Sequence, residues 1–130
     1  MEIFNTNFYL APGLNIHRNI LCGSIFEYFS EDPLVSGKIA AILTRGVQSH
    51  KNSGNDLAIT GNNHEFNRLN NNSKMFERAL REIYLKGFQI AIKESNPYEI
   101  MSYYNLINGI HTSRGPQLLI NDLRSEWNYT

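Results

Sequence analysis

Two arginines and one tyrosine are the side chains in this sequence best suited to bind a polar ligand: Arg18, Arg68 and Tyr104. An arginine presents several N–H donors in a fixed fork, and a tyrosine offers both a hydroxyl and an aromatic face. The 17 asparagines among 130 residues add many amide donors and acceptors. That composition suits the binding of sugar hydroxyls, and a codon bias would produce the same count.

Carboxylates occur in the same polar stretches, at Glu27, Glu31, Asp32 and Glu65. Two of these carboxylates could form a catalytic pair. Asp32, however, directly precedes Pro33, which is the pattern of an N-cap followed by proline at the first helical position. We therefore interpret Asp32 as a helix cap. Glu27 and Glu65 are interpreted as acceptors that brace arginines within their loops.

The histidines and the cysteine lack the spacing of a metal site. Cys22 is the only cysteine, and no C-x-x-C or H-x-x-x-H pair occurs. Cys22 also has no identifiable base that would activate it as a nucleophile. We expect no metal ion, no cofactor and no disulfide, which fits a reducing compartment. The four histidines are His17, His50, His64 and His111.

Three short strands and three helices are predicted to position these residues. Strands are predicted at residues 7–11, 57–60 and 98–104. The first helix begins at Pro33 and ends at about residue 50, because its apolar residues recur at intervals of three and four. Those residues are Val35, Ile39, Ile42, Leu43 and Val47.

The second helix is predicted over residues 74–94, with Ser73 as its cap and Asn96-Pro97 as its end. Its expected core stripe comprises Phe76, Leu80, Ile83, Tyr84, Phe88 and Ala91. A final helix is marked by Leu119, Leu123 and Trp127.

Alternation of strand and helix, repeated three times, predicts an α/β fold with parallel strands. The loops that follow the strands then lie on one face, where such folds build their sites. These loops are the polar stretches 10–33, 61–73 and 105–115. Arg18, Arg68 and Tyr104 are therefore expected to converge. The first loop is much longer than usual, and its composition predicts an ordered binding loop.

Composition excludes several classes of partner. The 12 basic and 12 acidic residues balance, so nothing predicts binding to nucleic acid. No run of 18 apolar residues predicts a membrane span, and the first residues lack the pattern of a secretory signal. We expect one domain in the cytoplasm.

Six segments carry a more specific pattern: LAPGLNIHRN, FEYFSEDPLVSGKIAA, TRGVQSH, GNNHEFNR, ERALREIYLKGF and IMSYYNLINGIH. In this order they resemble the family 3 glycoside hydrolases of the β-glucosidase type, which have an N-terminal (β/α)8 barrel. The match extends from about residue 7 to Trp127. It implies that residues 1–130 are part of such a TIM-type barrel domain, with three strand–helix units.

The resemblance also implies retaining hydrolysis of a β-glucosidic bond. One carboxylate attacks the anomeric carbon, and a second, about 5–5.5 Å away, protonates the leaving oxygen. Carried over by motif, Arg18 and Arg68 would donate to sugar hydroxyls, and Tyr104 would stack on the ring and form a hydrogen bond near the nucleophile. The implied partner is a β-glucoside or an oligosaccharide.

The sequence departs from the family pattern at the positions of the catalytic residues and at several positions near them. The family's nucleophilic aspartate follows a segment like the beginning of Trp127-Asn128-Tyr129, and the sequence ends at Thr130. The family's acid/base comes from a further domain. Residues 56–60 contain no Lys-His pair, Ile20 replaces a usual proline, and Ser24 replaces a usual arginine.

We therefore expect a slice from the middle of a barrel that is inactive alone, with no catalytic residue of its own. Two other hypotheses stay open. One is a non-catalytic carbohydrate-binding piece, and the other is a structural piece that completes a barrel with a separately encoded remainder.

Overall fold

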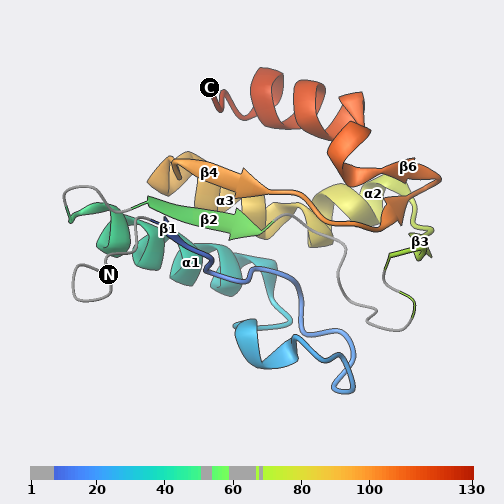
Figure 1. Cartoon of the computed structure of the whole chain (residues 1–130), viewed down its shortest axis with the longest axis horizontal. Coiled ribbons are helices and arrows are strands. Elements are labelled where there is room, and N and C mark those ends of the chain that lie inside the picture. The colour runs from blue at the N-terminus through green and yellow to red at the C-terminus, as the bar shows by residue number, and fades with distance from the viewer. Residues whose placement is uncertain (1–7, 51–53, 59–66, 68) are drawn as a thin grey trace.

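Parallel strands run through the centre of the molecule (Figure 1). The computed structural model describes residues 8–50, 54–58, 67 and 69–130. The strands lie in the order β1 (Phe8–Tyr9), β2 (Gly54–Ala58) and β4 (Glu99–Met101), with Leu57 opposite Ile100. Helices separate them along the chain. The predicted α/β alternation with parallel strands is confirmed.

The strand bounds differ from the predicted ones. β1 and β4 are both shorter than predicted. β4 ends at Met101, whereas the predicted strand continued to Tyr104. β2 begins at Gly54, three residues before the predicted start. The last two residues of that prediction, 59–60, lie outside the described residues.

The first helix, α1 (Pro33–Gln48), begins as predicted. The side chain of Asp32 accepts a hydrogen bond from the backbone N–H of Leu34 at 2.7 Å, and Pro33 occupies the first turn. Asp32 thereby satisfies one of the N–H groups that a helix start leaves unpaired. The interpretation of Asp32 as a cap is confirmed.

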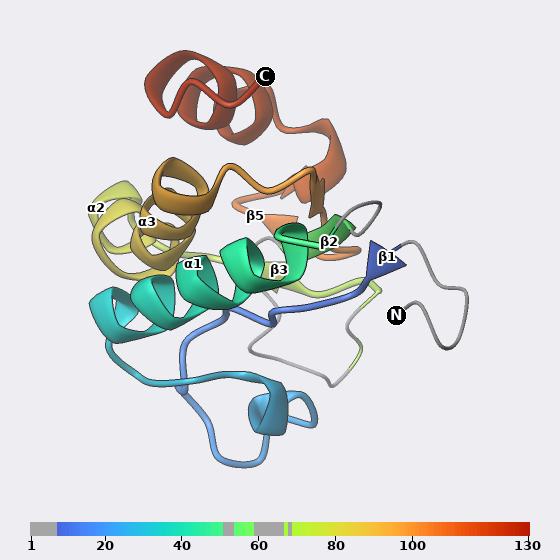
Figure 2. The same cartoon turned by 90° about the vertical axis from the view of Figure 1, so that its left-hand side faces the viewer.

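The face of α1 that packs in the structure is not the predicted one. Small residues form the buried face: Ser36, Gly37, Ala40, Ala41 and Thr44. They let α1 approach α3 (Lys86–Ser95) closely, and Figure 2 shows the two helices side by side. Four of the five apolar residues of the predicted stripe are exposed, with Ile42 at 60%, and Val47 is half-buried.

The second helical segment is interrupted. It consists of α2 (Glu77–Ala79), the π-helix η3 (Leu80–Tyr84) and α3. The predicted start was wrong, because Ser73 lies in a strand and Phe76 takes the N-cap position. The predicted end is confirmed, since Asn96 adopts a left-handed conformation with φ of 45° directly before Pro97.

The hydrophobic core joins α3 to the C-terminal helix and to the loop after β1. Its buried members are Leu14, Ala40, Leu85, Phe88, Ala91, Ile92, Leu118, Leu123 and Trp127. Phe88 and Ala91 are buried as predicted. Phe76 and Ile83 are not, with exposures of 88% and 43%. Phe76 lies before the helix, so helical spacing does not govern its direction.

A second small sheet was not predicted. It pairs β3 (Asn72–Ser73) in parallel with β5 (Leu106–Ile107), and β5 with antiparallel β6 (Ile110–His111). This sheet joins the segment before α2 to the segment after β4. The chain then forms the predicted last helix, the π-helix η5 (Gln117–Glu126).

Two 3-10 turns complete the described elements, η2 (Ile25–Glu27) and η4 (Thr112–Arg114). None of the described helices is long and apolar enough to cross a membrane. A cytoplasmic location stays a prediction.

Candidate functional site

The loop after β1, residues 10–32, is ordered by hydrogen bonds within itself; we call it the first loop. The N–H of His17 donates to the carbonyl of Ser30 at 3.1 Å. His17 Nε2 donates to the carbonyl of Ile25 at 3.1 Å. The ring of His17 also lies 6.3 Å from that of Tyr28. One histidine therefore ties the middle of the loop to its end, as expected of an ordered loop, and the binding role of the loop stays a prediction.

The loop after β4, residues 102–116, is braced in a similar way; we call it the third loop. Thr112 Oγ1 donates to the carbonyl of Tyr103, and His111 Nδ1 donates to the carbonyl of Tyr104 at 3.2 Å. Asn108 holds the tip, because its amide bonds both to the N–H of Met75 at 3.0 Å and to its carbonyl at 2.9 Å.

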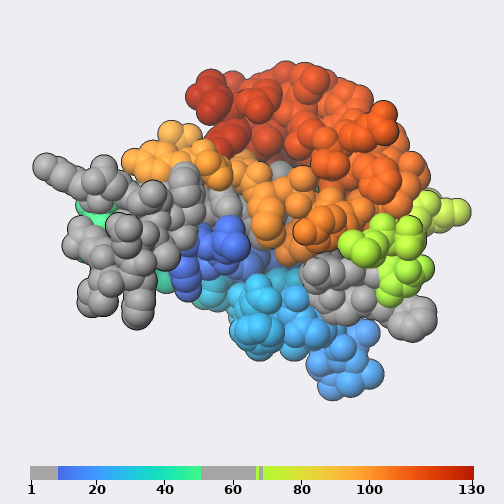
Figure 3. All heavy atoms as spheres, in the orientation of Figure 1, coloured from blue at the N-terminus to red at the C-terminus, as the bar shows by residue number. Residues whose placement is uncertain are grey.

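A buried asparagine joins these two loops. Asn15 is 1% exposed, and its Nδ2 donates to the hydroxyl of Tyr28 at 3.2 Å and to that of Tyr103 at 3.3 Å. In the space-filling view the first loop, in blue, projects beside the orange segment that follows β4 (Figure 3). Asn15, which sequence patterns did not indicate, thus joins the first loop to the segment after β4. The convergence of Arg18, Arg68 and Tyr104 stays a prediction.

The predicted binding residues have different surroundings. Arg18 is exposed, and its guanidinium carbon lies 5.9 Å from the centre of the Tyr84 ring, a cation–π distance. Tyr104 is 63% exposed. The structure brings their loops together without a hydrogen bond or ion pair between the two side chains in the described residues. Arg68 lies outside the described residues.

The remaining candidate residues are two glutamates, a histidine and a cysteine. Glu27 is exposed and has no arginine partner among the described residues, so its interpretation as a brace is not supported. Glu65 and His64 lie outside the described residues. Cys22 is buried and is not part of a disulfide. Over the described ranges, no three His, Cys, Asp or Glu side chains gather where they could hold a metal ion.

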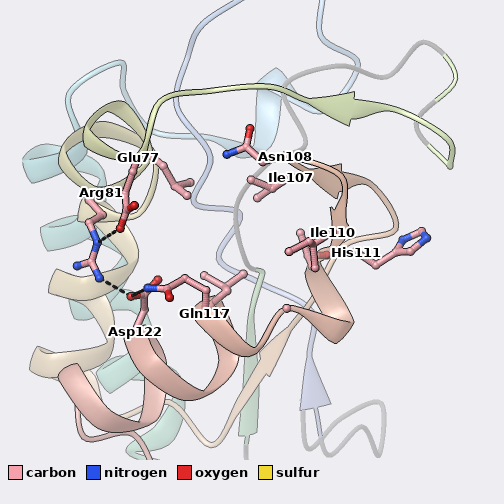
Figure 4. A pocket seen from close by; sticks show the side chains of 12 residues that line it. Glu77, Arg81, Ile107, Asn108, Ile110, His111, Gln117 and Asp122 are labelled. Carbon is pink, nitrogen blue, oxygen red and sulfur yellow. Dashed lines mark hydrogen bonds and ion pairs between the residues drawn. The ribbon is translucent and has the colours of Figure 1, made fainter.

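A pocket of about 170 Å³ lies between α2, the β5–β6 hairpin of the third loop and η5 (Figure 4). Its apolar lining includes Leu80, Ile107, Ile110 and Leu118. Neither Arg18 nor Tyr104 borders it. This pocket was not predicted, because the β5–β6 hairpin that forms one of its walls was not predicted either.

Arg81 closes one side of this pocket with a set of ion pairs. Its guanidinium lies 2.6 Å from Asp122, 2.8 Å from Glu126 and 3.3 Å from Glu77. Asp122 also accepts from Gln117 at 3.2 Å. The set ties η5 to the α2–η3 segment.

Burial and pairing shift the ionisation of this set in opposite directions. Burial raises the pKa of Asp122, and the Arg81 charge opposes that rise without cancelling it. The hydrogen bond from Arg81 lowers the pKa of the exposed Glu126. The same hydrogen bond to Glu126 raises the pKa of Arg81. The arrangement is a structural link and holds no unpaired acid suited to proton transfer.

Polar side chains on loops that follow parallel strands are the usual site of ligands in α/β proteins. The fold and the two joined loops define the chain as an α/β protein of this kind, with polar loops after its parallel strands. The relatives of the chain narrow the class further.

Several curated proteins match nearly all of the chain. β-Glucosidase A of Butyrivibrio fibrisolvens is 45% identical over 125 residues, which is 96% of this chain and 15% of that protein. β-Glucosidase B of Emericella nidulans is 48% identical over 92% of this chain and 14% of its own length. An exo-α-(1→6)-L-arabinopyranosidase of Bifidobacterium longum is 45% identical over 92% of this chain and 16% of its own length.

Solved structures agree. β-Glucosidase 3B of Thermotoga neapolitana, in complex with α-D-glucose, superposes with a TM-score of 0.93 at 47% identity. The superposition covers 97% of this chain and 18% of the Thermotoga neapolitana chain. The family 3 β-glucosidase of Bifidobacterium adolescentis gives 0.92 at 43% identity, over 97% of this chain and 19% of its own. No protein-family model matches the chain.

The chain is thus homologous, over nearly its whole length, to one stretch of the family 3 glycoside hydrolases of the β-glucosidase type. The resemblance predicted from its six segments is confirmed. The chain spans about 15% of the length of the curated relatives that it matches.

Proposed function

We propose that the chain supplies sugar-binding loops of a β-glucoside hydrolase and does not itself hydrolyse the glycosidic bond. The observation that carries the proposal is the 0.93 TM-score and 47% identity to a β-glucosidase solved with glucose. The joined first and third loops add to it, because they place Arg18 and Tyr104 on neighbouring segments of the described structure.

Each assigned residue has a chemical reason for its role. The guanidinium of Arg18 donates to neighbouring hydroxyl oxygens of a pyranose, and Arg68 adds a second fork on the loop after β2. The exposed face of Tyr104 stacks on the sugar ring, as its 63% exposure allows. No carboxylate of the 130 residues takes the role of nucleophile or of acid/base in the motif match. The bond-breaking groups are therefore assigned to sequence outside these residues.

Calorimetry and an activity assay test this proposal together. The chain should bind D-glucose with measurable heat, and Arg18→Ala or Arg68→Ala should weaken binding by about tenfold each, the cost of one charge-assisted hydrogen bond. The exposed Arg124 provides the matched control, and Arg124→Ala should leave binding unchanged.

In the same preparations, no hydrolysis of an aryl β-glucoside is expected. Turnover that follows the chain through purification would contradict the assignment of the bond-breaking groups. An absence of heat with D-glucose would refute the binding role.

A second function is favoured by the outer surface of α1. Four large apolar side chains there are exposed: Val35, Ile39, Ile42 and Leu43. They occupy a different face of the helix from the small residues that pack on α3. In the described sheet β1 pairs only with β2, so its other edge is open.

An open parallel strand beside an uncovered helix face fits one occupant, a further strand–helix unit that continues the same arrangement. We propose that the chain forms consecutive units of a (β/α)8 barrel whose remaining units pack on this edge and face.

A further inference from the structure

We propose that Asn15 is a positioning residue that fixes the first loop, carrying Arg18, against the third loop, carrying Tyr104. The inference rests on the proposed function, for which it names the group that sets the spacing of the sugar-binding side chains. Asn15 is 1% exposed, and a side-chain amide is buried at such a site at a high cost unless it is hydrogen-bonded.

The geometry of the amide is suited to this role. One Nδ2 group donates to Tyr28, 13 positions away in the same loop, and to Tyr103, 88 positions away in the third loop. The two N–H bonds of an amide diverge at a fixed angle within one plane. The positions of both hydroxyls are therefore set by a single rigid group, and Tyr28, at 6% exposed, has little room to shift.

Both loops are internally braced next to this link, so its effect reaches the binding side chains. Within the first loop, His17 bonds to Ser30 and Ile25, which holds the backbone between Asn15 and Arg18. Within the third loop, the carbonyl of Tyr104 accepts from His111. Loss of the bond from Asn15 to Tyr103 should therefore move one loop relative to the other, whereas loss of the bond from Asn15 to Tyr28 should loosen the first loop.

A pair of matched variants separates this role from a general contribution to stability. Tyr103→Phe removes only the hydroxyl that links the loops, whereas Tyr28→Phe removes only the hydroxyl within the first loop. Asn15→Leu removes both bonds at similar volume. All variants are measured at a temperature where circular dichroism shows the full chain completely folded, so lost stability does not enter the result.

Hydrogen–deuterium exchange and D-glucose titration are the two measurements. Tyr103→Phe should raise amide exchange in both residues 13–20 and residues 102–106, and it should weaken D-glucose binding by between about twofold and tenfold. Tyr28→Phe should raise exchange in the first loop only. In the Asn15→Leu background, Tyr103→Phe should have a smaller effect than in the unmodified chain, because the bond that the two residues share is already lost.

The inference is overturned if Tyr103→Phe leaves exchange at residues 102–106 unchanged, or if it weakens D-glucose binding no more than Tyr28→Phe does. Failure of the proposed function has a different signature: the unmodified chain then binds no D-glucose. In that case the exchange pattern still decides whether Asn15 couples the loops.

Discussion

At the scale of single residues, the most consequential ionisable group is Asp122, whose side chain is 3% exposed. Because burial raises its pKa, the folded chain holds this proton more tightly than the unfolded chain, in which aspartate has a pKa of about 3.9. Stability is then greatest below the unfolded value. It falls as the pH rises from about 3.9 through the raised folded pKa.

Asp122→Asn tests this sign. Urea unfolding from acid to neutral pH should show that the free energy of unfolding of the unmodified chain declines with pH relative to that of the variant. The lowered pKa of Glu126 makes stability rise with pH below the usual pKa range of a glutamate. Glu126 keeps its partner Arg81 in both proteins, so its contribution cancels in the difference between the two curves. Two parallel curves would contradict the assignment.

Residue-scale predictions from the sequence succeeded where the chemistry was local. Asp32 was recognisable as a cap because its acceptor and Pro33 are adjacent in the sequence. Asn15 was not recognisable, because its partner Tyr103 lies 88 positions away and the link exists only in the folded chain. Arg18 and Tyr104 were indicated by family motifs, whereas the ring of Tyr84 beside Arg18 was not.

At the scale of elements, α1 is organised by its small residues. A Cβ atom on Gly37 would lie 2.8 Å from the carbonyl oxygen of Gly87 and 2.9 Å from Cβ of Ile90. Neither distance is tolerated without a shift of α3, so Gly37 sets how closely the two helices approach. Gly46, in the same helix, has nothing within 4 Å of such an atom.

Alanine at these two glycines should have opposite effects on stability. Gly37→Ala should lower the free energy of unfolding by about 1–3 kcal/mol through overpacking. Gly46→Ala should raise it by about 0.5–1 kcal/mol through helix propensity. Chemical denaturation measures both, and equal effects of the two variants would show that α1 does not pack on α3 as described.

α1 also shows why helical periodicity predicted the wrong buried face. The apolar residues of α1 do recur at helical spacing, so the helix was predicted correctly, but spacing does not tell which neighbour a face will meet. Ser73 was misread as a cap for a related reason. It pairs opposite Ile107 in the small sheet, a long-range contact that outcompetes the local capping pattern.

At the scale of the whole molecule, the exposed face of α1 makes a prediction about assembly. Ile42 is 60% exposed, so Ile42→Lys should change the stability of the chain by less than about 0.5 kcal/mol. Co-expressed with the flanking parts of a relative such as the Butyrivibrio fibrisolvens enzyme, the unmodified chain should co-purify with them and restore aryl β-glucoside hydrolysis.

Ile42→Lys should abolish both co-purification and hydrolysis, because it places a charge in the expected contact, and Ile42→Leu should preserve them. If the Lys variant assembles as well as the unmodified chain, this face is not where further units pack.

The most direct test of the central claim is a titration of the isotope-labelled chain with D-glucose, followed by the shifts of its backbone amides, with L-glucose as the control. The account predicts saturable shifts with D-glucose that gather in residues 13–20 and 102–106 and are lost in Arg18→Ala. Shifts that are absent, or that L-glucose reproduces, would contradict the claim that these loops bind a sugar.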